Sequence, residues 1–210
     1  MASRTVQLAK AVDVASLAFG EPKAMSSGQK MIDITHADGS VLLVQTPALR
    51  CPFGVRPSGL DGVDKWTMDL ECYDAAEDSD RGVFVLLKDL QARFTEEAGR
   101  RGWTRATSQF VSSLKYGKDE KYPPLFKINV PKRFGKFACA AFDAATKKEL
   151  DLAATDLAKA RVTAILQCSG AWISPDGERC GVSWRVAQIK AEGAKDAEPD
   201  AVFSPYAFLE

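Results

Sequence analysis

Alternating hydrophobic and polar positions predict β-strands over much of this 210-residue chain. In residues 65–73 every second side chain is hydrophobic, which predicts a strand with one buried face and one solvated face. Asp69 and Glu71 fall on the solvated side of that strand. Further strand-like segments are residues 125–130, 137–142, 161–170 and 181–190.

A helical period replaces this alternation in residues 83–103, and Gly102 is well placed to end the helix. The hydrophobic positions with that period are Val83, Leu86, Leu87, Leu90, Phe94 and Ala98. Asp38-Gly39 predicts a hairpin within residues 30–46, and three prolines predict an extended surface connection over residues 46–62. Loops or turns are expected at residues 75–80, 132–136 and 143–148, whereas residues 151–159 fit either a short helix or a loop.

This order of elements predicts a mainly β fold, an OB-like five-stranded barrel with one inserted amphipathic helix and a flexible C-terminal tail. A single helix of crossover length argues against a layered β-α-β fold. The expected divisions are an N-terminal arm at residues 1–29, an OB-like domain at 30–191 and an acidic, aromatic tail at 192–210.

The charges of the chain are segregated although its net charge is zero, with 28 basic and 28 acidic residues. Residues 64–97 hold ten acidic and four basic residues, whereas residues 105–136 hold eight basic and two acidic ones. A local net charge of +6 attracts a polyanion more than the neutral total would suggest.

Catalytic and metal-binding signatures are missing from the sequence. It has no nucleophile-elbow, phosphate-loop, dinucleotide-binding or H-E-x-x-H motif, and its one histidine, His36, lies beside a predicted turn. We therefore expect no enzyme activity, no metal and no cofactor. The odd number of cysteines, five, favours reduced thiols, and residues 1–23 lack the apolar core of a secretion signal, so we expect a protein that is not secreted.

Residues 115–136 interleave lysine and arginine with aromatic side chains. Single-stranded nucleic acids bind to positive grooves that also offer aromatic faces for base stacking. Alternation places Phe126, Ile128 and Val130 inside and Lys127 outside, and we expect Trp184 in the core with Arg185 exposed. The candidate nucleic-acid-binding residues are Lys115, Tyr116, Lys118, Lys121, Tyr122, Lys127, Lys132, Arg133, Phe134, Lys136 and Arg185.

The last nineteen residues carry scattered acidic side chains and end in an aromatic-rich segment. They fit either a tail that binds partner proteins or a segment that packs on the barrel. The candidate partner-binding residues are Asp196, Glu198, Asp200 and Phe208.

The order of several motifs resembles the single-stranded DNA-binding proteins of nucleocytoplasmic large DNA viruses, which are similar to the replication protein of podophages that binds single-stranded DNA. The motifs lie between about residues 40 and 191: a T-P-x-L-x-x-P-F-G-like segment at 46–54, Trp66 to Tyr73, an L-x-x-L-x-x-x-F helix at 87–94, YPPLFKINV at 122–130 and GVSWRVAQIK at 181–190.

The resemblance implies an OB fold at residues 30–191 that binds single-stranded DNA without sequence preference in replication, recombination or repair. It also implies a C-terminal tail that contacts replication proteins, a possible homodimer, and a location in the nucleus or at a cytoplasmic viral replication site, with no membrane partner. The tail departs from the pattern, because it is less acidic and ends Phe208-Leu209-Glu210.

Two other functions fit the sequence. A protein-interaction or structural barrel could dock partners through the acidic residues 64–97, and an OB module could bind RNA, because base stacking does not distinguish the two sugars.

Overall fold

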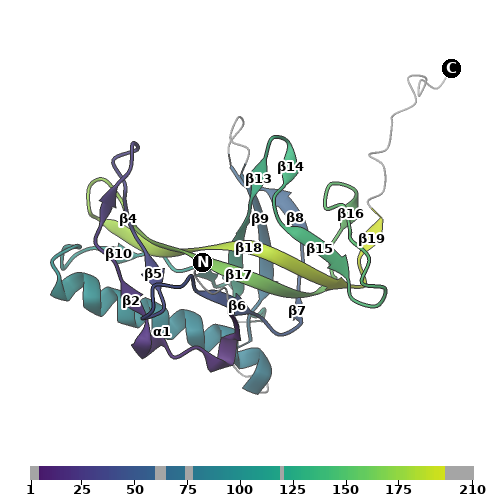
Figure 1. The fold of residues 1–210 in the computed structure, drawn as a ribbon, viewed down its shortest axis with the longest axis horizontal. Helices are drawn as coiled ribbons and strands as arrows, with labels where there is room; N and C mark the ends of the chain where they lie inside the picture. The colour runs from purple at the N-terminus through teal and green to yellow at the C-terminus, as the bar shows by residue number, and fades with distance from the viewer. Residues whose placement is uncertain (1–4, 60–64, 74–77, 119–120, 197–210) are drawn as a thin grey trace.

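Two long antiparallel strands, β17 (Arg161–Ile173) and β18 (Arg179–Glu192), form the centre of the fold (Figure 1). The computed structural model describes residues 5–59, 65–73, 78–118 and 121–196. Along the main sheet the strands follow the order β1 (Val6–Leu8), β6 (Leu43–Gln45), β17, β18, β12 (Leu125–Val130), β9 (Trp66–Glu71) and β8 (Val55–Pro57).

Other short strands of the main sheet lie off this path and pair with β17, β18, β12 or one another. They are β3 (Lys23–Ala24), β4 (Lys30–Ile32), β7 (Leu49–Arg50), β10 (Gln109–Phe110), β11 (Leu114–Lys115) and β15 (Ala140–Asp143). Three two-stranded sheets lie beside it: β2 (Ala18–Phe19) with β5 (Ile34–Thr35), β13 (Lys132–Arg133) with β14 (Lys136–Phe137), and β16 (Thr155–Asp156) with β19 (Lys195–Asp196).

The main sheet curls so that its two sides approach each other. Strand β7 pairs with β17, and Arg50 of β7 forms an ion pair with Glu71 of β9 at 3.2 Å. Met68, Ile128 and Leu166, from three different strands, are almost completely buried inside this curl. Over the described residues the predicted fold class, mainly β and OB-like with one α-helix, is confirmed, but the main sheet has 13 strands where five were predicted.

The helix α1 (Asp78–Arg100) lies along the lower side of the sheet, and its predicted hydrophobic face is buried (Figure 1). Gly102 has a φ of 67°, and the N–H groups of Gly102 and Trp103 donate to the carbonyls of Gly99 and Ala98. This pattern of bonds is the Schellman motif, which requires a left-handed residue where glycine stands. The helix begins at Asp78, so the acidic loop predicted for residues 75–80 is wrong over its second half.

Residues 5–24, which we assigned to an N-terminal arm, pair and pack with the rest of the fold. Strand β1 pairs in parallel with β6, and two 3₁₀ turns follow, η1 (Ala9–Ala11) and η2 (Val14–Ser16). Phe19 is buried with its ring 6.0 Å from that of Phe94 in α1. Hydrophobic residues spaced along this segment therefore cover part of the helix.

The turn predicted at Asp38-Gly39 is confirmed. The His36 N–H donates to Ser40, the Gly39 N–H donates to His36, and the Asp38 carboxylate accepts the Ser40 N–H at 2.9 Å. Hydrogen bonding with the side chain of Ser40, and then with its backbone N–H, lowers the pKa of Asp38. The flanking runs pair with each other only at the bridge between Thr35 and Val41, because β6 pairs with β1 and β17 instead.

All five cysteines are free and buried. Burial raises the pKa of Cys51 to about 11 and that of Cys168 to about 12, which keeps these thiols protonated at neutral pH. Within the described residues there is no cluster of three His, Cys, Asp or Glu side chains that could hold a metal ion. Over the same residues no helix is long and apolar enough to cross a membrane.

Replacing Gly170 by alanine tests the contact between β17 and β4. Gly170 has a φ of 102° at a register shift of β17, and a Cβ there would lie 2.4 Å from the Ile32 carbonyl oxygen. We expect Gly170→Ala to lower the free energy of unfolding by about 3 kcal/mol in chemical denaturation. Gly99→Ala is the control, because nothing lies within 4 Å of its Cβ position on α1 and alanine favours the helix.

Glu97 makes part of the stability depend on pH. Its buried carboxylate accepts hydrogen bonds from Arg100 and Arg101, which lower its pKa from 4.5 to about 2. A lowered folded-state pKa adds stability above pH 4.5, and this is lost as the pH falls towards 2. We expect Glu97→Gln to unfold more easily than wild type at neutral pH. Denaturation at a series of pH values should show that difference shrinking through this window.

Candidate nucleic-acid interface

The β13–β14 hairpin presents one aromatic ring to solvent. At its tip Phe134 and Gly135 both have positive φ, 50° and 77°, as in a type I′ turn. Glycine adopts this backbone freely, but phenylalanine does so at an energetic cost. Phe134 is nevertheless there, and its side chain is fully exposed. A large hydrophobic side chain held in this way contributes little to folding and is available for contact with another molecule.

Basic side chains surround this ring. The hairpin pairs Lys132 with Phe137 and Arg133 with Lys136, so three cations flank Phe134 within six residues. Arg133 and Lys136 are exposed, and no ion pair involves them in the part of the chain that the structure describes. The hairpin therefore combines positive charge with an aromatic face.

An aromatic cluster forms the base of the hairpin. The rings of Trp66 and Phe137 meet edge to face at 5.2 Å, and the Lys132 ammonium lies 4.7 Å from the centre of the Trp66 ring. A pocket of about 690 Å³ opens beside them, with Val55 and Leu152 also in its wall. Lys132 thus lies against aromatic faces in the wall of the pocket.

Below the hairpin, the outer face of the sheet is polar. This face carries Asn129 of β12, Arg185 of β18 and Gln167 of β17, which are neighbours across the strands. The Arg185 guanidinium donates to Gln167 Oε1 at 2.7 and 3.1 Å, which fixes its direction. Lys127 lies on the same face, where its ammonium donates to Ser58 at 2.8 Å.

The carboxylates of this face are buried and paired with arginines. Asp69 pairs with Arg56 of β8, and Glu71 pairs with Arg50 of β7 and accepts a hydrogen bond from Tyr73 at 2.6 Å. The prediction that Asp69 and Glu71 lie on a solvated face is wrong, because β7 and β8 bring arginines across them. This pairing removes negative charge that would repel phosphates.

Another group of predicted residues lies at the opposite end of β12 from the hairpin. The six residues of β12 span about 20 Å. Tyr116 and Tyr122 are exposed there, with Lys88 of α1 lying 5.9 Å from the Tyr116 ring centre and Lys121 5.7 Å from that of Tyr122. Lys115 and Lys118 are exposed beside them.

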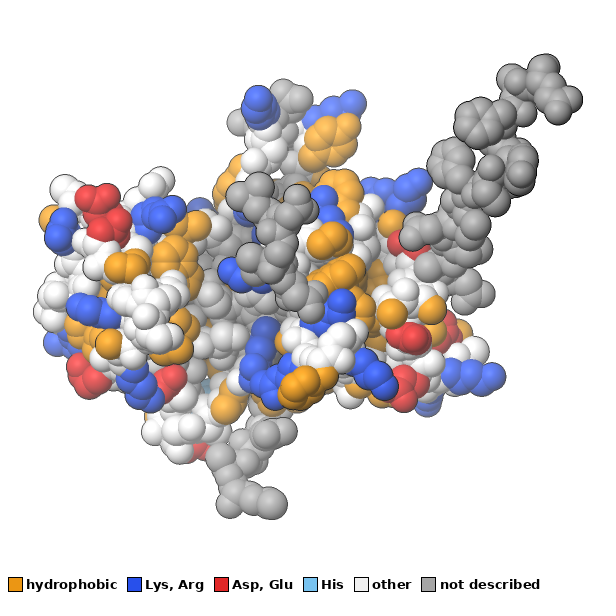
Figure 2. All heavy atoms as spheres, turned by 90° about the horizontal axis from the view of Figure 1, so that it is seen from above, with side chains coloured by type: hydrophobic (Ala, Val, Ile, Leu, Met, Phe, Trp, Pro, Cys, Tyr) orange, Lys and Arg blue, Asp and Glu red, His pale blue; other side chains and the backbone are white. Residues whose placement is uncertain are grey.

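The structure therefore divides the eleven predicted residues into three sets along β12. One set is at its start (Lys115, Tyr116, Lys118, Lys121, Tyr122), one in its middle (Lys127, Arg185) and one on the hairpin after its end (Lys132, Arg133, Phe134, Lys136). In the view from above, Lys and Arg side chains lie over the middle of the molecule and at both of its ends, whereas most of the Asp and Glu side chains on this face lie towards the two ends (Figure 2).

Of the predicted tail residues, only Asp196 has a described backbone, at the end of β19 opposite Thr155. Glu198, Asp200 and Phe208 lie outside the described residues.

Sequence patterns missed Trp66 and Phe137 as members of this surface. Alternation placed Trp66 on the buried side of its strand, and it does lie on that side. It stands at the rim of the barrel, however, and is only half-buried. The signal that could have found the pair is their position at strand ends, because an inward-facing residue at a strand end borders solvent.

No protein-family model matches the chain, and no curated protein matches it either. The solved structures that are similar to it include two bacteriophage proteins. One is gp2.5, a single-stranded DNA-binding protein encoded by bacteriophage T7, at 7% identity over 81% of this chain and 100% of that chain, with a TM-score of 0.49. The other is the single-stranded DNA-binding protein from bacteriophage Enc34, at 14% identity over 89% of this chain and 95% of that chain, with a TM-score of 0.49. Similarity at this level identifies neither a family nor a function.

Two phenylalanines near each other in sequence test the assignment of the hairpin tip. Phe134 is fully exposed, whereas Phe126 of β12 is buried with its ring 6.1 Å from that of Trp184. We expect Phe134→Ala to change the free energy of unfolding by less than about 0.5 kcal/mol. Phe126→Ala should lower it by about 3 to 5 kcal/mol. Chemical denaturation of both variants measures this, and a large loss for Phe134→Ala would show that the ring is packed.

Proposed function

We propose that this protein binds single-stranded DNA without sequence preference and has no catalytic role. The observation that carries the proposal is the fully exposed Phe134 ring, held at the tip of a hairpin whose neighbouring side chains are lysine and arginine. Such a ring can stack on the face of an unpaired base while the cations contact the adjacent phosphates. In a duplex the base faces are already stacked on one another, which favours a single strand as the ligand.

The outer face of the sheet supports the same ligand. Lys127 of β12 and Arg185 of the neighbouring strand β18 supply positive charge, and Arg56 and Arg50 neutralise the two carboxylates of β9 on the same face. A strand that contacts the hairpin could therefore continue over this face towards Tyr116 and the lysines near it. Contacts of this kind use phosphates and base faces, so they do not read sequence.

The acidic residues 64–97 give less support to a protein-docking function. Asp69, Glu71 and Glu97, three of the described carboxylates of this segment, are buried and paired with arginines. Their charges are therefore not available to a partner.

The motif order supports further proposals. We place the chain with the single-stranded DNA-binding proteins of nucleocytoplasmic large DNA viruses, in replication, recombination or repair, in the nucleus or at a cytoplasmic viral replication site. Contact with replication proteins through residues 192–210 and formation of a homodimer complete this proposal.

Binding should depend on the Phe134 ring and on salt. We expect Phe134→Ala to weaken the binding of an oligo-dT about tenfold, because stacking on one base is worth about 1 to 3 kcal/mol. Arg133→Gln and Lys136→Gln should each reduce the slope of log K against log salt by about 0.7, the value for one phosphate contact on a single strand. Fluorescence anisotropy at several salt concentrations measures both effects.

Arg105→Gln is the matched control, since Arg105 lies by Gly177 in the turn between β17 and β18, away from the hairpin. Its slope should equal that of wild type. Equal affinity of wild type and Phe134→Ala for the oligo-dT would show that the hairpin tip is not part of the binding site. The absence of salt-sensitive binding to any single strand would contradict the proposed function, and stronger binding of an RNA of equal length would identify RNA as the ligand.

A further inference from the structure

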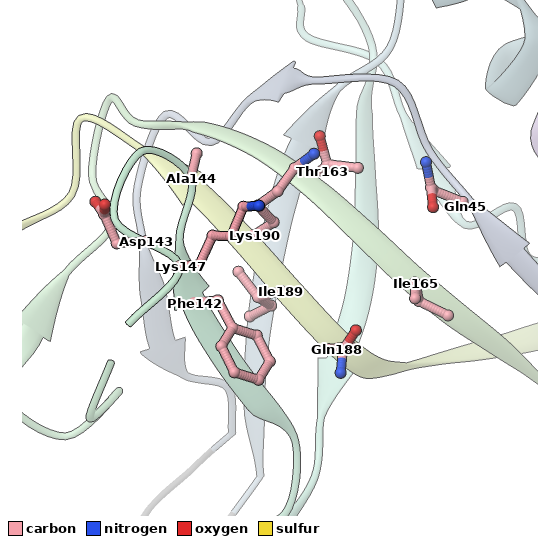
Figure 3. Close-up of a pocket in the computed structure, with 10 residues that line it drawn as sticks. All are labelled: Gln45, Phe142, Asp143, Ala144, Lys147, Thr163, Ile165, Gln188, Ile189 and Lys190. Atoms are coloured by element: carbon pink, nitrogen blue, oxygen red, sulfur yellow. The ribbon is translucent and has the colours of Figure 1, made fainter. Parts of the chain in front are cut away.

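A second pocket, of about 550 Å³, lies on the outer face of β17 and β18 where β15 joins them (Figure 3). Its size is within the range of small-molecule sites in proteins. Two rows of cross-strand neighbours line it. Gln45, Ile165 and Gln188 form one row, and Thr163, Lys190 and Phe142 form the other.

The side chains of this pocket can recognise a nucleobase. Phe142 is half-buried, and its ring extends beside Ile189 towards Gln188 (Figure 3). Gln45 and Gln188 each carry a carboxamide, which both donates and accepts hydrogen bonds. An aromatic ring with two such amides can stack on a base and bond to the edge of any of the four bases.

Two lysines add a site for a phosphate. The amines of Lys147 and Lys190 lie on the same side of the pocket, by Thr163, and the Asp143 carboxylate points away from them (Figure 3). Asp143 Oδ1 instead accepts the N–H groups of Ala145 and Thr146 at 3.1 and 2.7 Å within its own turn. No ion pair involves either lysine in the described ranges of the chain.

This pocket adjoins the surface proposed above. The next row of neighbours along the same strands is Leu43, Gln167, Arg185 and Asn129. Two residues along a strand correspond to about 7 Å, so the row that contains Arg185 and Asn129 lies only a short distance from the pocket. A single polymer can therefore contact both regions.

We propose that the Phe142 pocket binds one nucleotide of the same DNA strand. Phe142 stacks on its base, Gln45 and Gln188 bond to the base edge, and Lys147 and Lys190 contact its phosphates. This assignment rests on the proposed function and extends the path of the strand across β18 and β17.

The test uses the full chain with oligo-dT of increasing length, over the range of about 4 to 16 nucleotides that one OB fold covers. Phe142→Leu keeps an apolar side chain against Ile189 but removes the ring. We expect this variant to bind the longest oligomer about tenfold more weakly than wild type and the shortest one equally well. Phe142→Tyr should restore the affinity, because it restores the ring.

Adjacent lysines of one turn provide a matched pair of charge reversals. Lys147 lines the pocket, whereas Lys148 is exposed outside it. Lys147→Glu should weaken the binding of the longest oligomer at least fivefold more than Lys148→Glu.

Equal affinities of Phe142→Leu and wild type at every length, with Phe134→Ala still weakened, would overturn this inference and leave the proposed function intact. If wild type binds no single strand at all, this result contradicts the proposed function and with it this inference.

Discussion

The antiparallel pairing of β17 with β18 determines where the other elements of this protein lie. These two strands pair with each other along nearly their whole length, and the other side of each pairs with several shorter strands. β17 pairs in turn with β7, β6 and β4, and β18 with β15, β12 and β10. One face of the pair covers the core, and the opposite face aligns Gln167 and Arg185 with the polar residues of β12. The proposed binding surface is therefore a property of strand register.

The balance of charge follows from the same arrangement. The chain has equal numbers of acidic and basic residues, which hides the surface that we propose binds DNA. The structure buries several carboxylates against arginines, as at Asp69 and Glu97, whereas Arg133 and Lys136 of the hairpin form no ion pair with any described residue. Removing one partner of a buried ion pair destabilises the fold, and the pairing also changes which charges a ligand meets. The field at the surface thus differs from the field that composition alone suggests.

Sequence patterns predicted the local features that depend on near neighbours. The apolar face of α1, the turn at Asp38-Gly39 and the burial of Trp184 follow from periodicity, turn chemistry and alternation. The features that depend on distant pairing could not be predicted. Asp69 appeared solvated because nothing in its own strand indicates that Arg56 of β8 pairs with it. The pocket beside Phe142 could not be predicted because Gln45 and Gln188, which also line it, come from other strands. The exposure of Phe134 depends on its positive φ, a conformation that sequence patterns do not assign to phenylalanine.

The position of β18 near the end of the chain affects how the protein folds during synthesis. Its partners β10, β12, β15 and β17 all precede it, so the centre of the sheet cannot close until residues 179–192 have left the ribosome. Until then the edges of β12 and β17 lack their shared neighbour, and such unpaired edges associate readily with other chains. Because this closure joins segments far apart in sequence, we expect folding to be slow and to follow synthesis. Chains that stop before β18 should aggregate instead of accumulating as stable fragments.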